Sequence, residues 1–297
     1  MRVHFRTCLI ATLLSTLPLA AQAQSLPDWV EVSGRIEYEG LRTAGPDESL
    51  LYADLDVSFD FGAGSMGLGL DLGVLAYDAN NSSDSAIFAA LTYGTPHGKF
   101  SIGAPRGALG DYSRMPAVGG ISYLDLEMGP FTRGFVDYAA LSNDETPLGL
   151  RYDGQYGSLA VSASYHNFND LDAEIVDLAA SYESGIFFVT GGLEFLSDST
   201  DDVTLAHIEL GAKGDYYSGG IGFTNADSSV PDATMAWASY SALPNTDLTL
   251  SVFDTSGTTI WGLSGEWRFL NYSFVQLGVA DVTGGDTIWD ASIGLRF

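Results

Sequence analysis

The charged residues of one segment, 99–151, are the part of the chain whose types and spacing best suit a functional site. Five of the 12 Lys and Arg residues lie in or beside it: Lys99, Arg106, Arg114, Arg133 and Arg151. The same segment carries the acids Asp111, Asp125, Glu127 and Asp137. Opposed charges across a narrow passage create a transverse field that orders water and selects solutes. The segment is therefore predicted to select solutes, or to pair its own charges and hold itself in place, or to do both.

Signatures of catalysis are poor in comparison. His97, His166 and His207 are scattered, and neither a His-Glu-x-x-His nor a Gly-x-Ser-x-Gly motif occurs. Ser164 and His166 share one face of a predicted strand, but such pairs are common on polar faces. The sequence predicts no enzyme and no cofactor.

The elements that must position the charged segment are β-strands. In residues 288–297, apolar Trp289, Ile293 and Phe297 alternate with polar Asp290 and Arg296. Alternate side chains point to opposite faces of a strand, and about ten tilted residues cross a bilayer. Sixteen such strands are predicted, near 29–39, 50–61, 66–77, 85–94, 98–104, 147–153, 157–168, 173–183, 186–196, 202–213, 216–225, 232–242, 246–254, 258–269, 271–281 and 287–297. The prediction is an all-β, antiparallel, up-and-down transmembrane barrel, with 14 or 18 strands as alternatives.

Composition excludes several classes of protein. The formal charge is −26, from 12 bases against 38 acids, which excludes nucleic acid as a partner and favours cations over anions. No long apolar run follows residue 23 although 46% of residues are hydrophobic, so a helical membrane protein is excluded. The one cysteine, Cys8, lies in the N-terminal segment, so disulfides and thiolate metal sites are excluded.

Residues 1–23 have the organisation of a cleaved signal peptide. Arg2 and Arg6 precede an apolar run, and Ala21-Gln22-Ala23 has the small-x-small form of a cleavage site. The alternative is a membrane anchor, but the run is short for a bilayer span. We expect cleavage before Gln24, which leaves 24–297 as a single barrel domain.

Strand periodicity also predicts which charged side chains face the inside of the barrel. A Lys or Arg facing lipid at the midplane costs roughly 2–4 kcal/mol, and Asp or Glu costs less. The following residues are therefore predicted to line the pore wall: Arg35, Asp54, Asp56, Asp60, Asp71 and Arg151. Aromatic residues near strand ends are predicted to form girdles at the two membrane interfaces: Trp29, Tyr38, Tyr52, Phe61, Tyr77, Tyr93, Tyr152, Phe168, Trp267, Phe269, Tyr272 and Trp289.

One long segment, 105–146, interrupts the strands. A structureless loop of this length is usually functional or disordered. Its aromatic and aliphatic residues, among them Ile121, Phe131 and Phe135, argue against disorder. We expect it to fold onto the inner wall of the barrel.

With these features the chain resembles the general diffusion porins of Gram-negative outer membranes, particularly the acidic alphaproteobacterial kind. Phe100 to Ala108 is similar to the strand that leads into the third loop of that family, with Arg106 in place of its usual Gly-Arg, and Phe297 matches its C-terminal aromatic residue. Two features depart from the family pattern: Ala104-Pro105 interrupts the Gly-Arg pair, and the loop lacks a Pro-Glu-Phe-Gly-Gly turn.

The resemblance implies a homotrimeric, passive, water-filled channel for small hydrophilic solutes and cations in the outer membrane. Its partners would be outer-membrane lipid, lipopolysaccharide and the barrel assembly machinery, which would read Phe297. The third loop would form the pore constriction, which the charges assign to Arg106, Asp111, Arg114, Asp125, Glu127, Arg133 and Asp137.

Three alternatives stay open. A plugged or closed barrel could act as an adhesin or surface-binding protein, with the long segment as the plug. A secreted, soluble β-protein would need no membrane. In one acidic segment, Asp198, Asp201 and Asp202 could hold Ca²⁺, because hard cations prefer several oxygen ligands, or could serve only to solvate an outer loop.

Overall fold

The computed structural model describes residues 26–297 apart from 46, 63–66, 81, 200–201 and 228–230. The predicted signal peptide, 1–23, lies outside this part of the chain, so its cleavage stays a prediction. Within the described ranges, no helix is both long enough and apolar enough to span a membrane.

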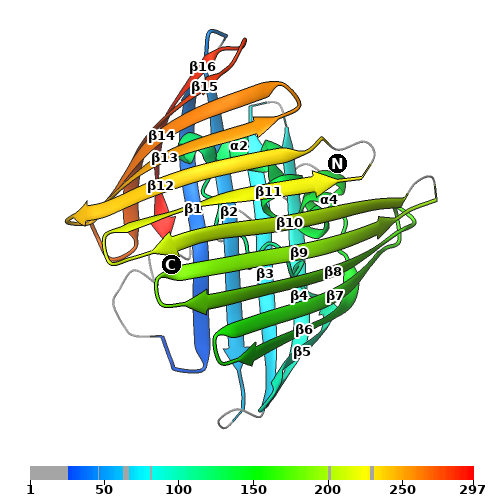
Figure 1. Ribbon diagram of the computed structural model, residues 1–297. Helices are drawn as coiled ribbons and strands as arrows, with labels where there is room; N and C mark the ends of the chain where they lie inside the picture. The colour runs from blue at the N-terminus through cyan, green and yellow to red at the C-terminus, as the bar shows by residue number, and fades with distance from the viewer. Residues whose placement is uncertain (1–25, 46, 63–66, 81, 200–201, 228–230) are drawn as a thin grey trace.

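Sixteen antiparallel strands close into one barrel, as the periodicity predicts (Figure 1). Each strand pairs with its neighbours in sequence, and β1 pairs with β16 to close the sheet. The strands are β1 (Val30–Arg42), β2 (Glu48–Asp60), β3 (Gly67–Ala79), β4 (Ser83–Thr95), β5 (Gly98–Ala104), β6 (Leu148–Tyr156), β7 (Leu159–Phe168), β8 (Ala173–Ser184), β9 (Phe187–Ser197), β10 (Asp202–Lys213), β11 (Tyr217–Ala226), β12 (Ala233–Leu243), β13 (Thr246–Thr255), β14 (Thr258–Arg268), β15 (Ser273–Val282) and β16 (Thr287–Arg296). Closure leaves no unpaired edge, which a bilayer would not tolerate.

The two faces of the sheet have opposite chemistry. Large apolar side chains such as Leu91, Ile102 and Leu277 are about 60% exposed on the outside. Their neighbours along the strands, including Ser101 and Gln276, are buried inside. This alternation is the pattern required of a barrel with lipid outside and water within.

One boundary of the prediction is wrong. We expected the sixth strand near 147–153, but β6 continues to Tyr156, so the turn before β7 has only residues 157–158. The strands extend further than their alternation indicates, because backbone pairing continues past the last apolar side chain.

The aromatic prediction also needs correction. Tyr52 and Phe168 are 1% and 0% exposed and point into the barrel, so they do not belong to an interfacial girdle. At the end where β1 begins, which we call the proximal end, Trp29 lies 6.1 Å from Phe59 between ring centroids. Trp267 lies 5.5 Å from Phe269. Such rings with one apolar side suit a membrane interface.

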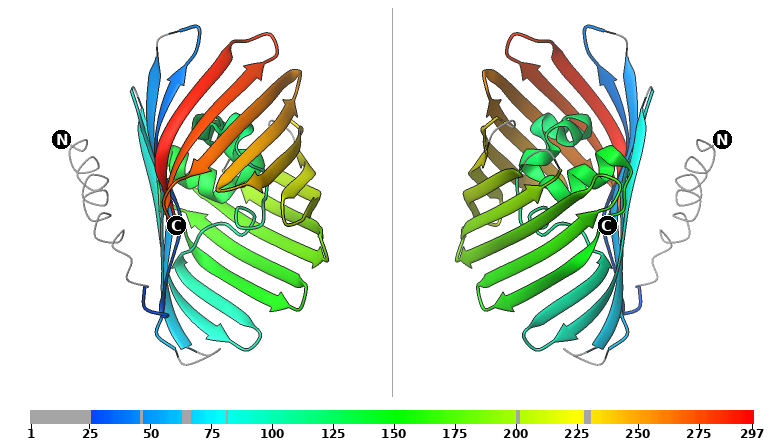
Figure 2. Two further views of the ribbon diagram at one scale, coloured as in Figure 1. Left: turned by 90° about the vertical axis from the view of Figure 1, so that its left-hand side faces the viewer. Right: turned by 90° about the vertical axis from the view of Figure 1, so that its right-hand side faces the viewer.

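The segment between β5 and β6 folds into the lumen, as predicted (Figure 2). It forms the short helical elements η1 (Val118–Gly120), α2 (Ser122–Glu127), α3 (Gly129–Thr132) and α4 (Phe135–Asn143). We call residues 105–147 the inner loop. Its apolar side chains pack on two patches of the inner wall. Leu109, Val136 and Leu141 pack against β2–β4, β7, β8 and β10. Val118 and Ile121 pack against β1, β9 and β12–β15. The inner loop therefore contacts most of the circumference.

Glycines allow the closest of these approaches. Gly119 has φ of +64°, and a Cβ there would lie 2.6 Å from the carbonyl oxygen of Val279. On the wall, a Cβ at Gly262 or Gly278 would lie within 2.2 Å of backbone atoms of Gly119. Loop and wall thus meet backbone to backbone at β14 and β15, which only glycine permits.

Carboxylates on the wall satisfy the backbone of the inner loop. Glu194 on β9 accepts a hydrogen bond of 2.7 Å from the N–H of Phe135, at the start of α4. Glu39 on β1 accepts bonds of 2.9 and 3.1 Å from the N–H groups of Ser122 and Tyr123. Asp177 on β8 accepts one of 2.8 Å from Leu109, and Glu209 on β10 accepts two from Arg114. All four acids, Glu39, Asp177, Glu194 and Glu209, are 0% exposed. We call them the anchor carboxylates.

The anchor carboxylates offset the free-energy cost of burying the backbone N–H groups of the inner loop. A buried N–H without an acceptor costs about 1–3 kcal/mol, and charged acceptors make the stronger bonds. At α2 and α4, the carboxylate also meets the positive end of the helix. The wall therefore fixes where the inner loop lies.

Replacing one anchor should loosen the inner loop and spare the barrel. In Glu194→Ala the N–H of Phe135 loses its acceptor, which destabilises the docked inner loop by about 1–3 kcal/mol. Each 1.4 kcal/mol raises the population of the undocked loop roughly tenfold. We expect trypsin to cleave after Arg133 at least about tenfold faster than in the wild type, measured on detergent-solubilised protein. Asp215→Ala, in the exposed β10–β11 turn, is the control; equal cleavage rates in the two variants would contradict the anchoring role.

Candidate pore constriction

Two arginines of the inner loop converge on Asp54 of β2. Arg106 Nη2 lies 2.7 Å from Asp54 Oδ1, and Arg133 Nη1 lies 2.5 Å from Asp54 Oδ2. Arg106 also pairs with Asp56 at 2.7 Å and with Asp137 at 3.2 Å. Arg133 pairs with Asp125 and donates to the hydroxyl of Tyr52. We call these seven residues the double-arginine cluster: Tyr52, Asp54, Asp56, Arg106, Asp125, Arg133 and Asp137.

The cluster is largely buried, so its charges depend on each other. Burial alone would lower the pKa of Arg106, but Asp54, Asp137 and Asp56 raise it above its ordinary value. Burial raises the pKa of Asp137 despite the opposing effect of Arg106. Arg106 lies 4.8 Å from the ring centroid of Phe88, which adds a cation–π contact. Removing one partner of such a group leaves an uncompensated buried charge, which costs about 3–5 kcal/mol.

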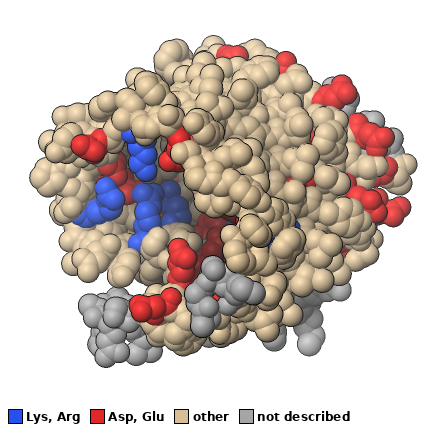
Figure 3. All heavy atoms as spheres, turned by 60° about the horizontal axis from the view of Figure 1, so that its bottom comes forward, with Lys and Arg blue, Asp and Glu red and all other residues tan. Residues whose placement is uncertain are grey.

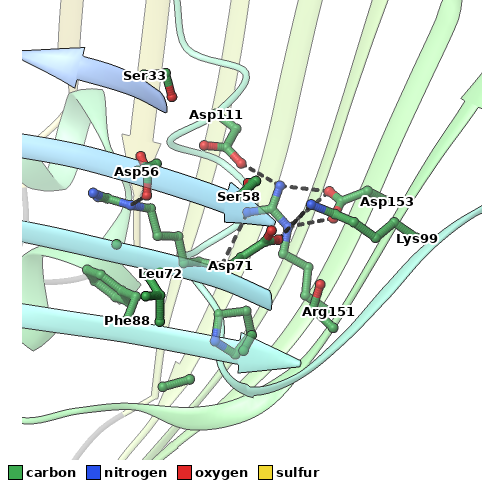
Figure 4. A pocket seen from close by; sticks show the side chains of 16 residues that line it. Ser33, Asp56, Ser58, Asp71, Leu72, Phe88, Lys99, Asp111, Arg151 and Asp153 are labelled. Carbon is green, nitrogen blue, oxygen red and sulfur yellow. Dashed lines mark hydrogen bonds and ion pairs between the residues drawn. The ribbon is translucent and has the colours of Figure 1, made fainter. Parts of the chain in front are cut away.

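A second group of charges surrounds Arg151 of β6 (Figure 4). Its guanidinium lies between Asp111 of the inner loop and Asp153, which is 2.7 Å away. It also donates to the carbonyl oxygens of Arg106 and Gly107, at 3.3 and 2.9 Å. Nearby, Lys99 pairs with Asp71 at 2.7 Å. These side chains line a cavity of about 210 Å³.

Arg114 stands apart from both groups. Its guanidinium pairs with Glu183 of β8 and lies 4.4 Å from the ring centroid of Phe188. Seen from the proximal end, Lys and Arg side chains gather in a hollow with acids around it (Figure 3). The basic residues of 99–151 thus face several parts of the wall, and they do not form one ring.

Not every residue that we predicted joins these groups. Asp60, at the end of β2, accepts a hydrogen bond of 2.8 Å from the N–H of Gly62 and so stabilises the turn. Glu127 is exposed at the end of α2, close to Tyr123. Arg35 pairs with Glu37 on its own strand and lies 5.0 Å from the ring centroid of Phe274.

Tyr52, Glu194 and the other anchor carboxylates were not among the predicted site residues. The signal that could have found the acids is their strand position, because Glu39, Asp177, Glu194 and Glu209 all occupy inward-facing positions. Alternation gives the face of each acid, but not which loop atom lies opposite it. Phe297 packs beside Ile36 and Leu55 on the outer face, with its ring 5.6 Å from that of Tyr272.

The remaining candidates from the sequence are the possible catalytic pair on β7 and the possible calcium ligands. Ser164 and His166 are both buried on β7, and no hydrogen bond joins them to each other. Across the described residues, no group of three or more His, Cys, Asp or Glu side chains could hold a metal ion. Of the candidate calcium ligands, Asp198 and Asp202 are described, whereas Asp201 lies outside the described residues.

Comparison with known proteins gives a match in structure but not in sequence. No protein-family model matches the chain, and no curated protein does. Three solved mutants of the porin of Rhodopseudomonas blastica are similar in structure, with TM-scores of 0.67, 0.65 and 0.64. They are 16%, 16% and 15% identical in sequence, and each match covers 90% of this chain and 100% of the other. The chain therefore has the 16-stranded porin barrel fold.

Proposed function

We propose that this protein is a passive channel of the bacterial outer membrane that passes small hydrophilic solutes and ions, with preference for cations. The observation that carries the proposal is the charged inner loop inside a barrel that is apolar outside. Cavities of about 210 and 380 Å³ lie beside the loop and are lined mostly by charged and hydroxyl-bearing residues. Such surfaces favour water and polar solutes.

Several finer features belong to the same proposal. The apolar belt and the fold shared with porins support an outer-membrane location, with the proximal end in the periplasm and a signal peptide removed on export. Association into trimers and recognition of Phe297 during assembly rest on the family resemblance alone. Cation preference follows from the excess of acids over bases in the chain, 38 against 12.

Single-channel recording tests the proposal directly. The detergent-purified protein in a planar bilayer with a KCl gradient should give stepwise conductance and a reversal potential of the sign expected for K⁺ preference, because acids dominate the pore. A trimer should close in three equal steps. Verified insertion without conductance would refute the channel, and a reversal potential of Cl⁻ sign would refute the cation preference.

Asp111 is the constriction acid best placed to act on passing ions. Its side chain is 51% exposed, and its partner Arg151 keeps a second partner in Asp153. In Asp111→Asn the charge of Arg151 becomes less compensated, so we expect the reversal potential to move toward Cl⁻ preference. Because Asp111 is half exposed and the buried Arg151 keeps its pair with Asp153, the melting temperature should change little.

The control for this prediction is Asp215→Asn, which removes the same charge from an exposed turn. We expect its reversal potential to stay at the wild-type value. If both variants shift equally, net charge and not the position of Asp111 sets the selectivity.

A specific observation also favours the second candidate, a plugged barrel that binds partners at the surface. The inner loop packs apolar side chains on most of the circumference of the lumen. A plugged barrel should conduct only after the loop is displaced. Conductance that is absent in the wild type and appears in Glu194→Ala would support this candidate over the open channel.

A further inference from the structure

We propose that a cavity at the proximal side of the inner loop binds small zwitterions, namely amino acids and short peptides. The inference rests on the proposed function, because solutes would reach the cavity through the channel. The cavity has a volume of about 880 Å³, which exceeds the two lumenal cavities described above. This size is within the range of pockets that hold small molecules.

The cavity lies between one stretch of the inner loop and one half of the wall. Asp111, Tyr112 and Arg114 form the loop side. Inward-facing residues of β6–β9, the end of β10, the start of β11 and the middle of β12 form the other side. Serines add hydroxyl groups, and Phe188 and Trp237 add an apolar surface. The walls therefore offer both polar and apolar contacts.

Arg114 is held in place before any solute arrives. Its N–H donates to both carboxylate oxygens of Glu209, at 3.2 and 3.0 Å, and the hydroxyl of Ser113 donates to the same group at 2.8 Å. The guanidinium lies over the ring of Phe188. A planar guanidinium with a fixed position is the preferred protein group for a carboxylate.

The charges around the cavity are balanced. Two bases, Arg114 and Lys213, face it together with two acids, Asp111 and Glu183. A solute with only a negative charge would meet the two acids, and one with only a positive charge would meet the two bases. A solute with both charges can place its carboxylate on Arg114 and its ammonium group on Glu183, which favours a zwitterion.

The existing pair between Arg114 and Glu183 can open for a solute. The two side chains are 31% and 59% exposed, and exposed pairs contribute only about 0–1 kcal/mol. Inserting a zwitterion replaces one ion pair by two, with little change in net charge. Tyr112 and Trp237 then flank the aliphatic or aromatic part of the solute. Affinity should be weak, so that the solute can also leave.

Ligand-observed NMR on the detergent-solubilised protein tests the site without requiring conduction. Leucine should bind saturably, and three analogues should bind at least about tenfold more weakly because each lacks one charge or both. N-acetylleucine keeps only the negative charge, leucinamide only the positive charge, and N-acetylleucinamide neither. Glucose should not compete with leucine.

Variants locate the binding. Arg114→Gln and Glu183→Gln should each weaken leucine binding about tenfold, because each removes one of the two charge partners. The matched control is Arg268→Gln, which removes a base paired with Asp247 at 2.7 Å and not lining the cavity. It should leave leucine binding unchanged.

Each contrary outcome overturns the inference in a distinct way. If N-acetylleucine binds as tightly as leucine, the cavity is an anion site. If leucinamide binds as tightly as leucine, it is a cation site. If glucose competes with leucine, it is a polyol site. No saturable leucine binding in a barrel that conducts would refute the inference and leave the channel function. Leucine binding by a barrel that never conducts would instead refute the channel function.

Discussion

The structure depends on satisfying the backbone of a long segment that is buried inside a barrel. The sheet uses most of its own N–H and C=O groups in closing, although the carbonyl oxygens of Leu55 and Val74 also accept from the side chain of Arg106. Side chains must serve instead, and Glu39, Asp177, Glu194 and Glu209 each accept loop N–H groups while fully buried. These acids hold the loop backbone at Leu109, Arg114, Ser122, Tyr123 and Phe135.

A consequence of this arrangement is that acids in the lumen fall into two groups. Those with little exposure, such as Asp137 and Glu194, hold the loop through hydrogen bonds and buried pairs. Those with high exposure, such as Asp111 and Glu183, make pairs that water can screen. Only the second group can exchange its partner for a passing solute. Structural pairing and the proposed selectivity are therefore compatible, because different acids would carry them.

The same geometry relates the two candidate functions. Apolar packing of Val118, Ile121 and Val136 on opposite parts of the wall narrows the lumen and holds the loop firmly. The charged cavities beside this packing are lined by Lys99 and Arg151 in one case and by Arg114 in the other. An open channel and a plugged barrel thus differ only in whether the narrowed region leaves a continuous path for water.

The sequence by itself determined the class of barrel: its antiparallel order, its apolar outer face and a long loop after the fifth strand follow from period-two alternation and turn spacing. It favoured sixteen strands over 14 or 18, and the closed sheet decides for sixteen. It also placed Asp54 on the pore wall and Arg106 and Arg133 in the loop that follows β5. Only the tertiary structure decided that both arginines meet on Asp54, that Asp60 stabilises a turn, and that Tyr52 and Phe168 point inward. The reason is physical: alternation depends on local backbone geometry, whereas the partners of a loop 40 residues long depend on contacts with strands distant in sequence.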